Sequence, residues 1–333
     1  MADSSENPVF EFALAYQKTA ALIAAVKLDI FTKIGAGTTS LEDLASRTES
    51  SVRGLRILCD YLTVIGLLEK QHSNYLLSQI SKTFLDESSP LAAGRIVDFV
   101  AAPEILELFL DDPTAYVRRG GSKGLANVSP DHPVWVRFAK AAVPFAAAAA
   151  RRVAGYVAKL PEPPFTVLDI AAGHGLYGIE VAKVAPEALV TAVDWEQVLR
   201  VTRANAVEAG VVDRFRMMAG NALDMDWGSD YDLVLLPNFL HHFDFDVCTA
   251  LLRKVKASLS ASGQAWAIDL VPNEDRISPP IPAMFAFWML ATTPGGDAYT
   301  IRELDEMARN AGFRGATTRA LAPTPESLIV FES

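Results

Sequence analysis

The chain has 333 residues, 50% of them apolar and 21% charged, a composition typical of globular proteins and unlike disordered or fibrous ones. Its 40 acidic and 30 basic side chains give a net charge of −10, which disfavours nucleic acid and anionic membrane surfaces as partners. A chain of this length has room for two domains, each with its own core.

Cysteine usage and the N-terminus both indicate a reducing compartment. Cys59 and Cys248 are far apart and stand among apolar residues, so we expect two buried free thiols. Cys and His spacing typical of a metal site is absent, so we expect no metal. The first residues carry no secretion signal, and the most apolar stretch, 139–150, is too short to span a bilayer. The sequence therefore predicts a cytoplasmic protein.

The first hundred residues have the periodicity of helices, with one β signal. Apolar residues recur at helical spacing over 12–31, which predicts one long helix there. Ser40 stands before an acidic first turn, so we expect it to cap a second helix. A third helix is expected over 51–65, followed by a hairpin over 67–78. Three helices and a hairpin are typical of a winged helix.

The rest of the chain divides at a proline-rich linker, 161–164. Residues 90–160 are mainly helical and contain a glycine-rich loop at 120–124. Beyond the linker, strands and helices alternate, which predicts a doubly wound, mainly parallel, Rossmann-like α/β sheet. The expected strands are 166–170, 189–193, 215–218, 231–236, 264–271 and 327–331, and the expected helices are 176–184, 198–208, 247–259 and 301–311.

A glycine-rich turn follows the first of these strands. Gly173 and Gly175 let the backbone turn tightly and let a ligand approach the main chain. The next helix offers its free N–H groups to an anionic group, such as a methionine carboxylate. Asp194 ends the second strand, where a carboxylate accepts hydrogen bonds from two ribose hydroxyls.

Two other interpretations of this turn stay open. Gly178 completes a Gly-x-Gly-x-x-Gly pattern, which is typical of NAD sites. The second interpretation is that these residues form an ordinary strand-to-helix turn. The acidic Asp169 at the strand end, and the position of the motif behind a helical domain, favour S-adenosylmethionine. The sequence therefore predicts that this cofactor is bound and S-adenosylhomocysteine released.

Polar residues also follow the third, fourth and fifth strands. Asn221, after Gly220, is placed to bind the adenine amino group with Ala222 against the ring, or else it forms a simple turn. His241 and His242 end the fourth strand, where one imidazole is suited to take a proton from a hydroxyl; a lone histidine is more often structural. Asp269 ends the fifth strand and either orients that imidazole or is solvated.

By these residues nearly the whole chain resembles the O-methyltransferases that include caffeic acid and acetylserotonin (hydroxyindole) O-methyltransferases and many bacterial tailoring enzymes. Residues 20–31 and 53–69 are similar to the winged-helix dimerisation domain of that family, and 168–175 to its first cofactor motif. Residues 293–300 resemble its loop before the last major helix, and 311–313 the end of that helix.

The resemblance implies a homodimer that methylates a small hydroxylated acceptor. It implies a dimerisation domain over 1–110, a helical linker over 111–160 that contributes to the substrate pocket, and a cofactor-binding domain over 161–333. The catalytic candidates are His241 as general base, His242 and Asp269. The cofactor candidates are Asp169, Ala171, Gly173, Gly175, Asp194, Trp195, Gly220, Asn221, Ala222, Asn238 and Phe239. The resemblance implies that Phe12 and Tyr16 reach across from the N-terminal helix of the partner copy to the acceptor. The other acceptor candidates, equally consistent with core or dimer interface, are Phe138, Phe145, Met284, Phe287 and Trp288.

Three positions depart from the family pattern. Asn221 stands where an Asp is usual, Pro237 replaces a Lys near the cofactor carboxylate, and Ala298 replaces a Glu beside the catalytic His. Asp269 is left as the obvious group to orient that His. Two alternative functions therefore stay open: a cofactor-binding member with other chemistry, such as C- or N-methylation, and a non-catalytic winged-helix regulator.

Overall fold

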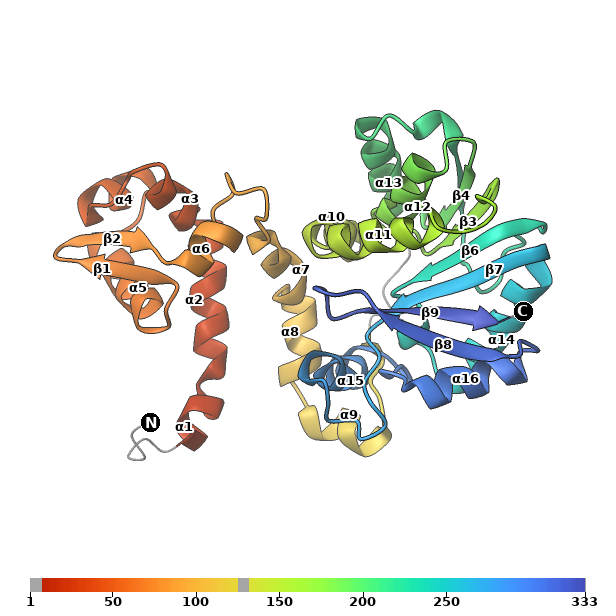
Figure 1. Cartoon of the computed structure of the whole chain (residues 1–333). Coiled ribbons are helices and arrows are strands. Elements are labelled where there is room, and N and C mark those ends of the chain that lie inside the picture. Colours follow the sequence, from red (N-terminus) through yellow and green to blue (C-terminus); the bar gives the residue numbers. More distant parts are fainter. Residues whose placement is uncertain (1–7, 125–131, 333) are drawn as a thin grey trace. The chain divides into compact units, whose positions relative to one another are not determined.

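The computed structural model describes residues 8–124 and 132–332 (Figure 1). The first residues, from which no secretion signal was expected, and 125–131 of the helical middle segment lie outside the described residues. The chain forms two compact units that divide after Pro103. Within the described part, no helix is long and apolar enough to cross a membrane.

The first unit begins with three helices where one was predicted. These are α1 (Pro8–Ala13), α2 (Ala15–Lys27) and α3 (Ile30–Gly35). The prediction of a continuous helix over 12–31 is wrong because the helix is interrupted at Leu14 and the chain turns at Asp29, whose φ is +57°. The turn folds α3 back, and Ile30 and Phe31 become fully buried in the core of this unit.

The rest of the first unit has the predicted order of elements. Helix α4 (Leu41–Arg47) starts at Ser40, whose hydroxyl accepts a hydrogen bond from the Asp43 N–H, which confirms the predicted cap. Helix α5 (Val52–Val64) is followed by the hairpin β1 (Leu68–Gln71) and β2 (Asn74–Leu77). Three short helical segments complete it: α6 (Gln79–Phe84), the 3-10 turn η1 (Gly94–Ile96) and α7 (Val97–Val100).

Four helices open the second unit, namely α8 (Pro103–Leu110), α9 (Pro113–Arg119), α10 (Pro133–Ala141) and α11 (Val143–Val157). The glycine-rich loop after α9 lies against the end of α15 (Pro280–Thr292). A side chain at Gly121 or Gly124 would run into the backbone of residues 292–294. Ser122 donates from its hydroxyl to the Ala291 carbonyl at 2.6 Å, so this loop is fixed.

A seven-stranded sheet forms the centre of the second unit, in the order β5-β4-β3-β6-β7-β9-β8. The strands are β3 (Thr166–Ile170), β4 (Leu189–Asp194), β5 (Phe215–Ala219), β6 (Tyr231–Pro237), β7 (Leu259–Asp269), β8 (Gly315–Ala320) and β9 (Ser327–Glu332). The first five are parallel and the last two antiparallel, which confirms the predicted mainly parallel sheet. Strand β8 was not predicted, because its residues after Ala316 are exposed and show no apolar alternation.

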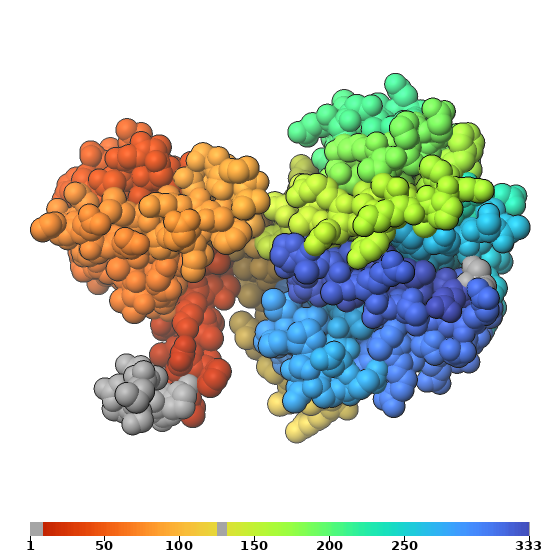
Figure 2. Space-filling model, in the orientation of Figure 1, coloured from red at the N-terminus to blue at the C-terminus, as the bar shows by residue number. Residues whose placement is uncertain are grey.

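Helices cover both faces of this sheet. Apolar residues of α14 (Phe245–Ser258) and α16 (Ile301–Asn310) pack on one face. Residues of α11 and α12 (Leu176–Val184) pack on the other, and α13 (Glu196–Glu208) lies beside β4 and β5. Figure 2 shows the dark-blue loop between β8 and β9 against the yellow-green α11, where the Arg152 Nε donates to the Ala322 carbonyl.

Candidate active site

The glycine turn lies at the carboxyl end of β3, the central strand of the sheet. Ala171, Gly173 and Gly175 all have positive φ, of +54°, +59° and +75°. A Cβ on Gly175 would stand 2.5 Å from the Thr202 Cγ2 atom, so a side chain is excluded there by contact as well as by conformation. The Gly175 position therefore excludes a side chain, and the turn is braced from within, because the Gly175 N–H donates to the Ala172 carbonyl at 2.7 Å.

Asp194 ends β4 and its carboxylate faces this turn. The Oδ2 atom accepts a hydrogen bond from the Gly173 N–H at 2.8 Å, and Oδ1 accepts one from the Trp195 N–H at 2.7 Å. Each oxygen keeps a further lone pair for a ligand hydroxyl. Burial raises the pKa of Asp194 to about 6, against two backbone N–H bonds that lower it. The carboxylate is therefore fixed in place and ready to accept from a ribose diol.

Two side chains of α13 hold the turn through its carbonyl groups, and no local sequence pattern marks either of them. Thr202 donates from its hydroxyl to the Gly173 carbonyl at 2.8 Å, and Asn205 donates from its amide to the His174 carbonyl at 2.8 Å. Burial lowers the pKa of His174 to about 4, and its Nδ1 accepts from the Leu176 N–H. The imidazole in this turn is therefore neutral at pH 7.

Asp169 is fully buried at the end of β3. Its Oδ2 accepts from the Gly178 N–H at 3.1 Å, while Oδ1 is buried without a hydrogen-bond partner in the described structure. Burial raises the pKa of Asp169 to about 7. An orphaned buried oxygen beside a bare backbone turn fits a site that a polar ligand completes.

The loop after β5 is tied to the same end of the sheet. The Gly220 N–H donates to the Asp194 carbonyl at 3.0 Å. The Asn221 side chain folds into its own loop: Oδ1 accepts from the Leu223 N–H, and Nδ2 donates to Asp224 at 2.6 Å. Ala222 is 6% exposed and belongs to the core on the α14 side. The residue that departs from the family pattern thus shapes the loop itself.

Lys254 on α14 holds this loop from the other side, and sequence analysis missed it. Its ammonium donates to the carbonyls of Ala222, Leu223 and Met225 at 3.0, 3.3 and 2.6 Å. It also lies 3.7 Å from the centre of the Trp227 ring, which is a cation–π contact. No sequence pattern marks this lysine as part of the site, because its partners are main-chain atoms about 30 residues away.

His241 and Asp269 form a buried pair at the ends of β6 and β7. His241 lies in the 3-10 turn η4 (Leu240–His242) that follows β6. Its Nδ1 is 2.7 Å from the Asp269 Oδ1, which also accepts from the Leu270 N–H at 2.8 Å. Because a carboxylate accepts hydrogen bonds, Nδ1 carries the hydrogen and the lone pair is on Nε2. The arrangement orients the imidazole so that Nε2 is the ring nitrogen that can act as a base.

The other candidates at the carboxyl edge of the sheet make contacts that differ from those of His241. His242 does not bond to Asp269; burial and the adjacent His241 lower its pKa well below 6.5, so it is neutral at pH 7. Asn238 has a φ of +52° and donates from its N–H to the Ile268 carbonyl. Phe239 packs edge-on against Phe243 at 4.9 Å. Trp195 packs at the start of α13 with residues of α10.

Aromatic side chains of α15 divide between the histidine pair and α8 and α9. Phe285 packs edge-on against His241 with ring centres 4.8 Å apart. Phe287 and Trp288 face the other way and contact Phe109 at 6.3 and 5.0 Å. One face of this helix therefore lies beside the candidate base.

The remaining acceptor candidates are exposed or partly buried residues of five helices. Met284 and Phe145 are 65% and 47% exposed on α15 and α11, and Phe138 is partly buried on α10. Phe12 and Tyr16 are exposed on α1 and α2 of the first unit. Among residues 8–124 and 132–332, no cluster of three or more His, Cys, Asp or Glu side chains is placed to hold a metal ion.

The strand order, the glycine turn and the acid after the second parallel strand together define a class I methyltransferase domain. Residues 158–314 match the family model of the O-methyltransferase domain, and residues 10–87 match that of the O-methyltransferase dimerisation domain. The chain is 45% identical to a Nostoc punctiforme protein assigned as an O-methyltransferase. The structural match between the two covers 99% of this chain and 100% of the Nostoc chain, with a TM-score of 0.93.

Characterised relatives have the same reaction type. The chain is 25% identical to the 3-hydroxy-5-methyl-1-naphthoate 3-O-methyltransferase of Streptomyces sahachiroi over 91% of this chain and 88% of the relative. It is 23% identical to the tetracenomycin polyketide synthesis 8-O-methyltransferase of Streptomyces glaucescens, over 97% of this chain and 95% of that relative. Solved structures of this fold hold S-adenosylmethionine or S-adenosylhomocysteine. The protein belongs to the S-adenosylmethionine-dependent O-methyltransferase family, and neither alternative function is favoured.

Proposed function

We propose that the protein methylates a hydroxyl group on a small aromatic acceptor of the polyketide type, with His241 as general base. The observation that carries the proposal is the buried bond of 2.7 Å between the His241 Nδ1 and Asp269, which orients the ring so that Nε2 is left to act as the base. The naphthoate and tetracenomycin relatives act on aromatic compounds, and Phe285 beside His241 offers a face suited to such a ring.

The residues of this chain divide the work between cofactor and acceptor. S-adenosylmethionine, when bound, supplies a methyl group on a positively charged sulfur. Asp194 holds the ribose, Gly173 and Gly175 bare the backbone for the methionine end, and Trp195, Ala222, Asn238 and Phe239 line the nucleoside. His241 takes the acceptor proton at Nε2 as the new carbon–oxygen bond forms, and Asp269 stabilises the resulting imidazolium.

The choice of a general base is tested by a matched pair of variants, His241→Ala and His242→Ala. Each is incubated with labelled cofactor and a panel of hydroxynaphthoates and hydroxylated anthraquinones, and methylated products are measured by mass spectrometry. We expect His241→Ala to lower kcat by roughly 100- to 10,000-fold, the range of a lost general base, with unchanged affinity for S-adenosylhomocysteine. His242→Ala is expected to keep most activity. Full methylation by His241→Ala would refute the assignment.

We also propose that the protein acts as a homodimer through a dimerisation domain over residues 1–110, with residues 111–160 as a helical linker that lines the acceptor pocket. Val9, Phe10, Phe12 and Tyr16 on α1 and α2 are between 56% and 81% exposed, far more apolar surface than a lone helix keeps in water. The match of residues 10–87 to the dimerisation domain supports a second copy as the cover. The test is the sedimentation of the Phe10→Asp and Phe12→Asp variants. Variants that sediment as monomers would support this assembly, and variants that still sediment as dimers would contradict it.

A further inference from the structure

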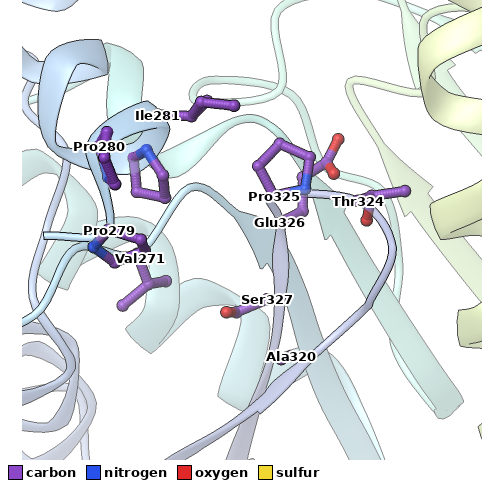
Figure 3. Close-up of a pocket in the computed structure, with 10 residues that line it drawn as sticks. Val271, Pro279, Pro280, Ile281, Ala320, Thr324, Pro325, Glu326 and Ser327 are labelled. Carbon is purple, nitrogen blue, oxygen red and sulfur yellow. The ribbon is translucent and has the colours of Figure 1, made fainter. Parts of the chain in front are cut away.

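A pocket of about 320 Å³ opens at the carboxyl edge of the sheet, beyond the end of β7. Figure 3 shows the start of α15, with its prolines and Ile281, facing Pro325 and Thr324 of the β8–β9 loop. Most of the wall is apolar, and its size matches the lower end of small-ligand sites. The lining residues are Val271, Pro279, Pro280, Ile281, Pro282, Ala320, Thr324, Pro325, Glu326 and Ser327.

Glu326 is the one charged residue of this wall. Its Oε2 atom is buried and has no hydrogen-bond partner in the described structure, and no ion pair between described residues involves it. Burial raises the pKa of Glu326 and the negative charge of Asp269 adds to that rise, against hydrogen bonds from Thr324 and from the Glu326 main chain that lower it. The Leu321 N–H donates to the Glu326 carbonyl, which fixes the backbone at this point of the loop. A buried carboxylate oxygen that is held in place without a partner requires an explanation.

The pocket adjoins the proposed methyl-transfer site along the chain and across the sheet. In the β7–β9 ladder, Ser327 is directly opposite Asp269, the carboxylate that bonds to His241. Val271 follows Asp269 by two residues on the other wall. A molecule that reaches both places needs to span only the end of one strand. The lining contains no Lys or Arg, and Asp269 lies close enough to Glu326 for its negative charge to raise the pKa of that carboxyl.

We propose that this pocket, the Glu326 pocket, binds a positively charged amino group carried by the methyl acceptor. The proposal rests on the proposed function, since it assigns a substituent of the same substrate. An ammonium on an otherwise apolar fragment supplies the donor that Oε2 lacks and offsets the two neighbouring carboxylates. The prolines and Ile281 then contact the apolar part of the fragment. Glu326 is in this view a specificity residue and takes no part in the transfer itself.

The test measures binding without turnover, on the full chain saturated with S-adenosylhomocysteine. Calorimetry compares tyramine with 4-ethylphenol, a neutral molecule of nearly the same shape, at pH 7 and 0.15 M salt. We expect tyramine to bind about tenfold more tightly, because its ammonium reaches a partly buried carboxylate. In Glu326→Gln the two probes are expected to bind equally. Glu187→Gln, which changes an exposed carboxylate at the opposite edge of the sheet, is the control and should keep the tenfold preference.

A second variant locates the binding. Ile281 is 57% exposed at the pocket mouth, so Ile281→Trp narrows the pocket without entering the core. Both probes should bind at least fivefold more weakly to it, with unchanged affinity for S-adenosylhomocysteine. Absence of tyramine binding, equal binding of both probes to the wild type, a preference that survives Glu326→Gln, or full binding to Ile281→Trp would each overturn the proposal. None of these outcomes touches the methylation assay of His241→Ala, so the two proposals fail separately.

Discussion

The two halves of the active-site edge are built in different ways. On the proposed cofactor side, main-chain groups take part in each contact: Gly173 and Trp195 donate their N–H groups to Asp194, and two side chains of α13 donate to carbonyls of the turn. On the acceptor side, side chains from distant segments meet, as His241 does with Asp269 and Phe285. Main-chain contacts suit a site for one constant ligand. Side-chain contacts allow the second ligand to vary while the proposed base, His241, stays in place.

This difference explains why members of one family share a cofactor and differ in acceptor. A backbone turn with positive φ tolerates few sequences, so the cofactor site changes little. Aromatic and apolar side chains on α15 are exchanged without disturbing the sheet, because Met284 and Phe287 are more than half exposed. The following predictions separate the two halves, in order of decreasing expected effect.

The strongest test of the main-chain design is Gly175→Ala. The φ of +75° and the contact at 2.5 Å with Thr202 together cost roughly 2–6 kcal/mol for a Cβ at this position. We expect affinity for S-adenosylhomocysteine, measured by calorimetry, to fall by about 100-fold or more, and methyl transfer to fall with it. Gly155→Ala is the matched control, because a Cβ there meets no atom within 4 Å. Wild-type affinity in Gly175→Ala would show that the turn adapts.

Asp269→Asn tests the acceptor half alone. The amide loses the charge that stabilises an imidazolium and leaves the His241 ring less firmly oriented. We expect kcat to fall by roughly 10- to 100-fold, less than for loss of the base itself, while cofactor affinity stays unchanged. The pH profile of kcat separates this role from a structural one, since its acidic limb should shift when the carboxylate is removed. An unaltered profile with unaltered kcat would mean that Asp269 does not orient the base.

The pH dependence of cofactor binding tests Asp194. Because burial raises its pKa from 3.8 to about 6, the folded free protein binds more protons than the unfolded chain between these values. This group therefore stabilises the free protein most below pH 3.8, and its contribution is lost as pH rises through 6. Ribose hydroxyls favour the ionised form, so affinity for S-adenosylhomocysteine should be roughly tenfold weaker at pH 5 than at pH 7. The Asp194→Asn variant should bind S-adenosylhomocysteine weakly at both pH values. If its affinity still changed with pH, another group would be responsible.

The smallest expected effect belongs to Asn221→Asp, which restores the usual residue of the family. Asn221 already uses its amide within the loop, and Oδ1 keeps a lone pair for the adenine amine. The carboxylate accepts more strongly but loses the bond to Asp224, so we expect affinity to change by only about two- to fivefold. Calorimetry with S-adenosylhomocysteine measures it, with Asn205→Asp, which loosens the turn, for comparison. A change above tenfold would give Asn221 a larger role.

Much of the second unit could be predicted because its signals are local. The bounds of β3 and α12 agree with prediction to the residue, since a buried strand, a glycine turn and an amphipathic helix follow one another without interruption. The failures have physical causes. Strand β8 lies at an edge and exposes most of its residues, so no apolar alternation marks it. The break at Asp29 lies inside continuous helical periodicity and depends on the packing of Ile30 and Phe31.

The sequence by itself determined the cofactor class, because the conformation of a glycine turn and the acid that follows the next strand depend on neighbouring residues. Only the tertiary structure decided which side chains work together. His241 and Asp269 are 28 residues apart, and Lys254 meets carbonyls about 30 residues away. Glu326 reaches the edge of the site only because β9 pairs with β7 in a register that sets Ser327 opposite Asp269. Register and packing depend on the whole sheet, so no local pattern encodes these partners.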